Sequence, residues 1–158
     1  MGEHRAKIAW KQGGGEWSRG KYSREHTWSF DGGQTVIASS SPSAVPVPLS
    51  NPAGVDPEEA LVASVSSCHM LTFLYLAYKA GFQIETYVDD ASGSMAKNDK
   101  GIAWVDKITL RPEIRFVGDK RPSVEELEKL HHDSHEQCFI SNSVKSEVVV
   151  EPVAAPAA

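Results

Sequence analysis

The chain contains two cysteines, and both lie in sequence contexts where a reactive thiol would be of use. Cys68 lies in the most hydrophobic stretch of the protein, between Val65 and Leu71. Cys138 follows 70 residues later, at the end of a charged, histidine-rich segment. Two isolated cysteines without an apolar export signal indicate either a redox pair or inert core thiols, and not a disulfide framework.

A reactive Cys68 requires a cation, because its expected position in the middle of a helix denies it the helix N-terminus that often lowers a thiol pKa. Arg24 is one candidate, since it shares one face of an alternating segment with aromatic side chains. An arginine on such a face either extends to solvent or is buried with a carboxylate. Glu58 is a candidate partner, although about 15 Å of helix separates it from Cys68. Arg19, in the preceding turn, is the alternative cation.

Composition favours a soluble globular protein of one domain. The chain has 158 residues, of which 41% are hydrophobic and 23% charged, and these values are ordinary for such a domain. A net charge of −5 leaves no basic surface for nucleic acid. The polar N-terminus and the expected lack of a window of about 20 apolar residues argue against a signal peptide and a membrane span. We therefore expect a cytoplasmic protein.

The N-terminal third has the period-2 alternation of strands. Residues 4–11, 21–30 and 34–38 are predicted strands, with a hairpin turn at Asp31-Gly32-Gly33. Within 21–30, one face carries Tyr22, Arg24, His26, Trp28 and Phe30. Residues 39–55 are rich in serine and proline, which predicts an irregular crossing segment.

Helix signals begin at Asp56, which is followed by a proline and by a glutamate at the third helical position. Apolar residues run on to Ala80 and Gly81 provides the stop, so a long helix buried on most sides is predicted. Two long strands over 82–95 and 102–116, a second helix from Ser123 to about Gln137 and a closing strand over 143–150 follow. The order predicts an α+β fold with antiparallel sheets packed around the long helix. We expect a single domain over 1–150 and a disordered tail over 151–158.

Two motifs resemble those of the OsmC/Ohr family of thiol-dependent hydroperoxide reductases. In that family an Asn/Asp-Pro-Glu turn opens the central helix, and the peroxide-attacking cysteine follows ten positions after the glutamate, as Cys68 follows Glu58. The segment Cys138-Phe139-Ile140-Ser141-Asn142 resembles the second cysteine motif, with Phe139 where proline is common. The resemblance covers roughly residues 5–150.

The resemblance implies an OsmC-like, intertwined homodimer with two active sites at the subunit interface. It implies that Cys68 attacks a peroxide as the thiolate and that Cys138 resolves the sulfenic acid as a disulfide. The family's catalytic arginine comes from an early strand–loop region and pairs with the glutamate. Arg24 lies seven residues before the Asp31 turn, nearer the family spacing than Arg19, so Arg24 and Glu58 are the expected catalytic pair.

The same chemistry predicts the substrate and partners. An apolar wall around Cys68, including Met70 and Phe73, favours organic hydroperoxides over hydrogen peroxide, and His69 is a candidate lining residue. The reaction needs a dithiol reductant (a lipoylated protein, thioredoxin or a small thiol) and no metal, flavin or haem. We expect an antioxidant enzyme of the oxidative stress response, with no nucleic acid or membrane partner.

Two other functions are compatible with the residues. His131, His135 and Cys138 are spaced i, i+4 and i+7, which puts three zinc-type ligands on one helical face. The chain would then be a metal-binding protein. Alternatively, an unreactive Cys68 would leave a non-catalytic redox-sensing or ligand-binding domain with the same fold.

Overall fold

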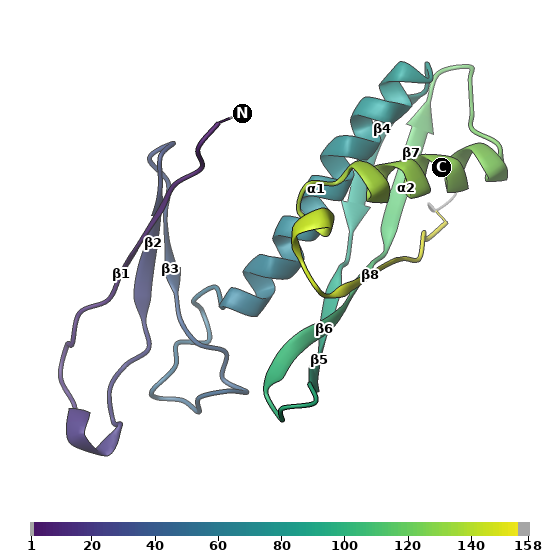
Figure 1. Ribbon diagram of the computed structural model, residues 1–158. Coiled ribbons are helices and arrows are strands. Elements are labelled where there is room, and N and C mark those ends of the chain that lie inside the picture. Colours follow the sequence, from purple (N-terminus) through teal and green to yellow (C-terminus); the bar gives the residue numbers. More distant parts are fainter. Residues whose placement is uncertain (1, 155–158) are drawn as a thin grey trace. The chain divides into compact units, whose positions relative to one another are not determined.

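The structure is a computed structural model, and it describes residues 2–154 (Figure 1). The chain forms two compact units, residues 1–60 and residues 61–158, and we describe each separately. The α+β fold is confirmed, with two α-helices and short sheets among the described residues.

The first unit contains an antiparallel sheet of β1 (Ala6–Ala9), β2 (His26–Phe30) and β3 (Thr35–Ala38). Trp28 of β2 pairs with Ile8 on one side and Val36 on the other. A short 3₁₀-helix, η1 (Trp17–Arg19), lies between β1 and β2. The predicted hairpin at residues 31–33 and the irregular segment over 39–55 are confirmed.

The strand predicted over 21–30 is shorter than expected. Its first half is bonded to other loops: the Arg24 N–H donates to the Leu49 carbonyl at 2.8 Å, and the Trp10 indole N–H donates to the Ser23 carbonyl at 2.8 Å. The alternation of side chains persists, because Tyr22, Arg24 and His26 are half-buried while the residues between them are exposed.

The long helix α1 (Pro57–Lys79) begins and ends where its signals predicted. The Asp56 carboxylate accepts from the Glu59 N–H at 2.7 Å, and the Glu59 carboxylate accepts from the Asp56 N–H at 3.2 Å, which is a capping box. Gly81 supplies the left-handed stop with φ of 81°.

Only one stripe of α1 is buried in this chain. The stripe repeats every four residues and consists of Val65, His69, Phe73 and Ala77. On another face Leu71 is 61% exposed and Tyr78 is 74% exposed. The prediction of a helix buried on most sides was therefore wrong for the single chain, since the chain supplies packing partners for one side of the helix alone.

The hydropathy of α1 corrects a second prediction. By length and composition this helix could cross a membrane, although the sequence was expected to contain no such window. Length and composition do not distinguish a membrane span from a core helix, and the buried stripe of α1 supplies both hydrophobic clusters of the second unit.

The second unit contains two sheets, because the two arms of one long hairpin, residues 83–97 and 103–117, are each interrupted and contribute one strand to each sheet. Strand β4 (Gln83–Asp89) pairs with β7 (Pro112–Val117), and β5 (Ser92–Lys97) pairs with β6 (Ala103–Leu110). Among the described strands all pairings are antiparallel apart from β6 with β8 (Glu147–Val150), which is parallel.

Each of the two long predicted strands is therefore two strands. The break in the second arm falls at Arg111, directly before Pro112, which has no N–H to donate to a ladder. The Arg111 N–H is satisfied instead by the Asp89 carboxylate at 2.6 Å. Asp89 is the last residue of β4, so this one hydrogen bond joins the break after β4 to the break before β7.

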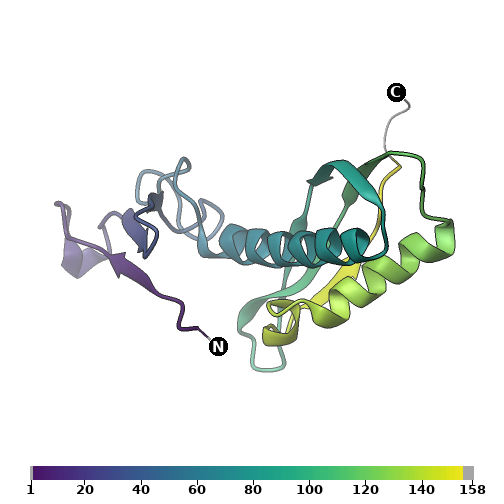
Figure 2. The same ribbon diagram turned by 90° about the horizontal axis from the view of Figure 1, so that it is seen from above.

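Helix α2 (Val124–Gln137) lies beside α1 (Figures 1 and 2), and Leu130 of α2 packs in a cluster with Phe73 and Ala77 of α1. The predicted capping box is confirmed, because the Ser123 hydroxyl accepts from the Glu126 N–H at 3.1 Å and the Glu126 carboxylate accepts from the Ser123 N–H at 2.8 Å. A second cluster joins Val65 to Ile108 and Leu110 of β6.

The end of the chain departs from the sequence prediction. The closing strand starts at Glu147 because residues 141–143 form a 3₁₀-helix, η2. In the tail expected to be disordered, the Glu151 N–H donates to the Leu110 carbonyl and the Val153 N–H to the Pro112 carbonyl. Residues 155–158 of that predicted tail lie outside the described residues.

Candidate thiol site

The two cysteines, 70 residues apart in the sequence, are brought into contact in the second unit. Cys68 lies in the middle of α1 and is half-buried, while Cys138 caps the C-terminus of α2 and is fully buried. Each thiol shifts the pKa of the other, so the two sulfurs are close neighbours, and both cysteines are free. Two thiols in contact can exchange between the dithiol and the disulfide with little movement.

A tight turn positions Cys138. The Ser141 N–H donates to the Cys138 sulfur at 3.3 Å, and the Asn142 side-chain amide donates to the Cys138 carbonyl at 2.9 Å. The same amide donates to the Glu136 carbonyl at 2.9 Å, which ties the turn back to α2. The segment of residues 138–142 that carries the family resemblance therefore folds as one unit around the sulfur.

The environment of the pair shifts the two thiol pKa values in opposite directions. Burial raises the pKa of Cys68, and the neighbouring Cys138 raises it further. The pKa of Cys138 is lowered, although burial opposes this, because the Cys68 thiol and donors at Ser141 and Ile140 stabilise its thiolate. Among the described residues, no cation contributes to either pKa.

Of the three residues predicted to contact substrate, two are in the interior. His69 and Phe73 are fully buried on the core stripe of α1, whereas Met70 is half-buried. His69 and Phe73 therefore do not form a surface wall in this chain, because positions 65, 69, 73 and 77 all face the core. Apolar residues occur on every side of α1, so the sequence alone does not show which side faces the core. Packing with α2 selects the side that carries His69 and Phe73.

His69 is paired with a histidine of α2. Its Nε2 lies 3.2 Å from Nδ1 of His131, and the two rings lie nearly parallel. The His131 ring also packs against Phe73 in a tilted arrangement, with centroids 4.5 Å apart. Burial, with a smaller contribution from His135, lowers the pKa of His69 to about 4, and burial, with a smaller contribution from His69, lowers that of His131 to about 4. Both rings are therefore neutral at pH 7.

The predicted metal ligands do not converge. His131 faces His69, and Cys138 faces Cys68. Within residues 2–154, no three histidine, cysteine or carboxylate side chains are arranged to hold a metal ion. The helical spacing alone predicted a shared face, but a helix 14 residues long presents these side chains to two different neighbours.

Arg24 and Arg19 have different environments in the first unit. Arg24 is half-buried, and its guanidinium lies 3.8 Å from the centre of the Tyr22 ring and donates to the Gly20 and Tyr22 carbonyls. Arg19 forms an exposed ion pair with Glu16 at 3.3 Å. Among the described residues Glu58 has no ion pair, so the expected Arg24–Glu58 pair is not formed in this chain.

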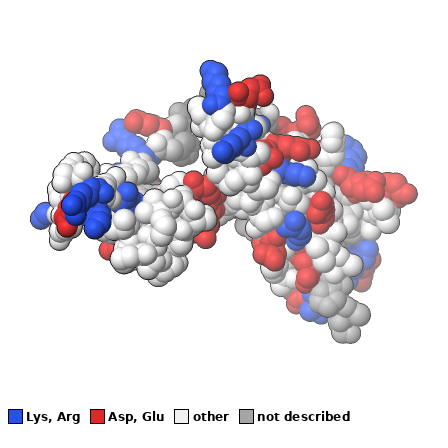
Figure 3. Space-filling view, turned by 90° about the horizontal axis from the view of Figure 1, so that it is seen from below, with Lys and Arg blue, Asp and Glu red and all other residues white. Residues whose placement is uncertain are grey.

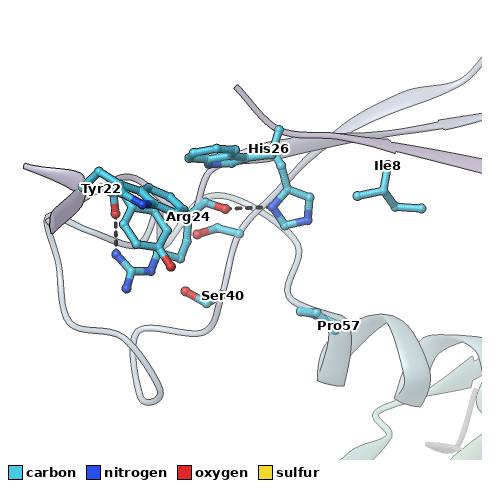
Figure 4. A pocket seen from close by; sticks show the side chains of 9 residues that line it. Ile8, Tyr22, Arg24, His26, Ser40 and Pro57 are labelled. Atoms are coloured by element: carbon cyan, nitrogen blue, oxygen red, sulfur yellow. Dashed lines mark hydrogen bonds between the residues drawn. The ribbon is translucent and has the colours of Figure 1, made fainter. Parts of the chain in front are cut away.

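Arg24 lines an apolar pocket of about 360 Å³ in the first unit (Figure 4). Trp10, Trp17 and Tyr22 form an aromatic cluster along it, with ring centroids 4.5 to 5.7 Å apart. His26 is fixed, because its Nδ1 lies 2.7 Å from the Arg24 carbonyl and its Nε2 accepts from the Trp28 indole at 2.9 Å. The pocket therefore combines an aromatic wall with one guanidinium.

Sequence reasoning missed the two tryptophans of this pocket and the turn that binds Cys138. The signal for the tryptophans was the aromatic density of residues 10–28. An open depression of about 600 Å³ is lined by Leu71 and Tyr75 of α1 and by Phe139, which are near Cys68 and Cys138 in the sequence, although neither cysteine lines it. Phe139 is 82% exposed, so the thiol pair lies next to accessible apolar surface. On the face in Figure 3, acidic and basic side chains are interspersed.

Comparison with known proteins gives consistent matches. The OsmC-like protein family matches residues 50–153. An OsmC-like protein of unknown function from Vibrio cholerae is 51% identical over 97% of this chain and 100% of its own, with a TM-score of 0.94. A comparison with curated proteins gave no match.

Two more distant structures share the fold. An organic hydroperoxide resistance protein from Elizabethkingia anophelis is 15% identical over 99% of this chain and 98% of its own, with a TM-score of 0.71. An organic hydroperoxide resistance protein from Bacillus subtilis is 19% identical over 95% of this chain and 97% of its own, with a TM-score of 0.61.

Proposed function

Because the chain belongs to the OsmC/Ohr family of OsmC-like proteins, we propose that it is a thiol-dependent peroxidase that reduces organic hydroperoxides to alcohols in the oxidative stress response. The observation that carries the proposal is the contact between the Cys68 and Cys138 thiols. Contact between two otherwise isolated cysteines is what a peroxide-driven disulfide cycle needs.

The proposed reaction has three steps. The Cys68 thiolate attacks the distal peroxide oxygen, the O–O bond breaks, and the alkoxide takes a proton to give an alcohol and a Cys68 sulfenic acid. The Cys138 thiolate then attacks the Cys68 sulfur, the S–O bond breaks as the disulfide forms, and the departing hydroxide takes a proton to give water. A dithiol reductant returns both cysteines to thiols and is itself oxidised to a disulfide.

The difference in access supports the proposed roles of the two sulfurs. Cys68 is half-buried and borders accessible apolar surface, whereas Cys138 is fully buried. The lowered pKa of Cys138 suits the resolving role, because a ready thiolate attacks the sulfenic acid before a second peroxide over-oxidises it. Phe139 and Leu71, both exposed beside the thiols, favour a substrate with an organic tail.

Attack by Cys68 needs a cation, since burial raises its pKa. Arg24 is our proposed source, because it is half-buried beside an aromatic wall while Arg19 is engaged in an exposed ion pair. Glu58 is its proposed partner in the assembled enzyme, as the family resemblance implies. The guanidinium would stabilise both the thiolate and the departing alkoxide.

The proposal includes a homodimer in the cytoplasm. The exposed apolar face of α1, with Leu71, Tyr75 and Tyr78, is the surface that a second copy would cover. A reducing compartment keeps the two thiols available between cycles. Sedimentation at micromolar concentration would detect the dimer, and a monomer would remove this part of the proposal.

A thiol titration tests the function. Reduced protein is mixed with one equivalent of cumene hydroperoxide or of hydrogen peroxide, and free thiols are counted over time. The proposal predicts that two thiols are lost together and that the organic peroxide acts faster. Retention of both thiols with either peroxide would refute it.

A second function, a redox sensor without turnover, is favoured by one observation: the pKa of Cys68 is raised and no described cation contributes to it. A sensor would lose its thiols slowly and would not consume peroxide continuously. Peroxide consumption over many turnovers, with dihydrolipoamide as the reductant, separates the two functions.

A further inference from the structure

The position of Arg24 is not fixed by a sheet ladder. Arg24 lies in the stretch that leads into β2, which begins two residues later at His26. The Arg24 N–H donates to the Leu49 carbonyl at 2.8 Å. Its guanidinium donates through Nη1 to the carbonyls of Gly20 and Tyr22, and all three of these partners lie in loops. The bond from Arg24 to the sheet runs instead from its carbonyl to the His26 imidazole.

Both ring nitrogens of His26 are engaged, and the two contacts together define where its proton resides. Nδ1 lies 2.7 Å from the Arg24 carbonyl (Figure 4), and a carbonyl oxygen only accepts, so Nδ1 carries the proton. Nε2 lies 2.9 Å from the Trp28 indole nitrogen, which only donates, so Nε2 carries the lone pair. The Nδ1–H tautomer alone satisfies both contacts.

Trp28, His26 and Arg24 therefore form a relay of hydrogen bonds along one face of the first sheet. They share that face because they occupy alternate positions of an extended chain. The relay is anchored at the sheet end, since Trp28 lies in the middle of β2 and His26 pairs with the fully buried Ala38 of β3. The order of the sheet is thus passed to Arg24, which lies outside it.

The same contacts set the direction of the remaining donors of Arg24. Nη1 bonds to the two loop carbonyls, and the guanidinium lies 3.8 Å from the centre of the Tyr22 ring. A guanidinium is planar and holds its five N–H groups in a fixed fork. Fixing Nη1 and the plane therefore fixes Nε and Nη2, which are the donors that a thiolate or a departing alkoxide would meet.

We infer that His26 is a positioning residue of the proposed peroxidase, and that it holds the Arg24 guanidinium in one orientation for its role at the thiolate. The inference rests on the proposed function of Arg24. A misplacement of about 1 Å can cost about 100-fold in rate, and loss of a group that orients a functional side chain typically costs about 10–100-fold. Because His26 acts through Arg24, its loss has no separate effect once Arg24 is removed.

Two amide variants separate the two bonds of His26. In His26→Asn the side-chain amide ends near the position of Nδ1 and can still donate to the Arg24 carbonyl. In His26→Gln the amide ends near Nε2, so it keeps an acceptor for the Trp28 indole and loses the bond to Arg24. We expect His26→Gln to slow thiol loss with cumene hydroperoxide about 10–100-fold, and His26→Asn to slow it about threefold. His132→Gln, at an exposed position of α2, should react at the parent rate.

Three further readouts distinguish positioning from a general loss of structure. His26→Gln should raise the pKa of Cys68, as Arg24→Ala does, which the pH dependence of alkylation measures without peroxide. In the Arg24→Ala background, His26→Gln should slow the reaction by less than about twofold more, whereas a change that only loosened the fold would slow both backgrounds equally. Nitrogen-15 NMR of the reduced parent at pH 7 should show a protonated Nδ1 and an unprotonated Nε2 at His26.

Three results would overturn the inference in a parent protein that reacts with peroxide. The first is an Nε2–H tautomer of His26, and the second is an equal rate for His26→Gln and His26→Asn. The third is the full effect of His26→Gln in the Arg24→Ala background. A parent protein that keeps both thiols with either peroxide would instead refute the proposed function, and the role of His26 with it.

Discussion

The buried His69–His131 pair should make the protein sensitive to mild acid. Each pKa is lowered from 6.5 to about 4 in the folded state. Between these values the unfolded chain binds more protons than the folded chain, so stability is retained above pH 6.5 and lost as the pH falls toward 4. His135 adds to the lowering at His69, and Asp89 opposes it.

The size of the effect follows from the shifts. Moving from pH 7 to pH 4.5 should remove about 2.4 kcal/mol of unfolding free energy for each histidine that takes up its proton on unfolding. The two rings share a hydrogen bond, and a ring pair can retain that bond with one extra proton but not with two. We therefore expect a loss of about 2–5 kcal/mol for the pair, a large part of a typical domain's stability.

Urea unfolding at pH 7 and pH 4.5 measures this loss. The double variant His69→Leu/His131→Phe lacks both imidazoles, so its stability should fall by about 2–5 kcal/mol less than that of the parent over the same interval. His132→Gln, which removes an exposed histidine, should fall as the parent does. Equal losses in the parent and the double variant would refute the assignment of buried, neutral histidines.

Three further predictions test the site and the core. Cys68→Ser should abolish peroxide turnover, while Cys138→Ser should consume one equivalent per subunit and then over-oxidise at Cys68; steady-state assays and intact mass distinguish these outcomes, and turnover by Cys68→Ser at the parent rate would contradict the roles. Arg24→Ala should raise the pKa of Cys68 and slow peroxide reduction more than Arg19→Ala does, as measured by the pH dependence of thiol alkylation; the reverse ranking would assign the role to Arg19. Phe73→Ala, at a fully buried position, should lower the unfolding free energy by about 3–5 kcal/mol, and a loss below about 1 kcal/mol in urea unfolding would contradict its place in the core.

Local signals predicted the helices well. Asp56 with Glu59, and Ser123 with Glu126, satisfy backbone N–H groups within one turn of chain. Such contacts depend on residues three positions apart, so they can be recognised in the sequence. The strands were less predictable, because the breaks near Asp89 and Arg111 depend on a contact across 22 residues.

The thiol site could be predicted only in part. The family resemblance supplied the two cysteines, but their ionisation depends on donors in the turn after Cys138 and on the burial of Cys68. The His69–His131 pair depends on packing between two helices across 62 residues. The only sequence signal for it was that His69 occupies the buried four-residue repeat between Val65 and Phe73.

Peptide mapping under non-reducing conditions tests the central claim most directly. Reduced protein is treated with one equivalent of cumene hydroperoxide, alkylated, digested and analysed by mass spectrometry. We predict a Cys68–Cys138 linked peptide that is absent from untreated protein and disappears on reduction. Recovery of both cysteines as alkylated thiols, or of Cys68 as sulfinic acid with Cys138 alkylated, would contradict a two-cysteine peroxidase.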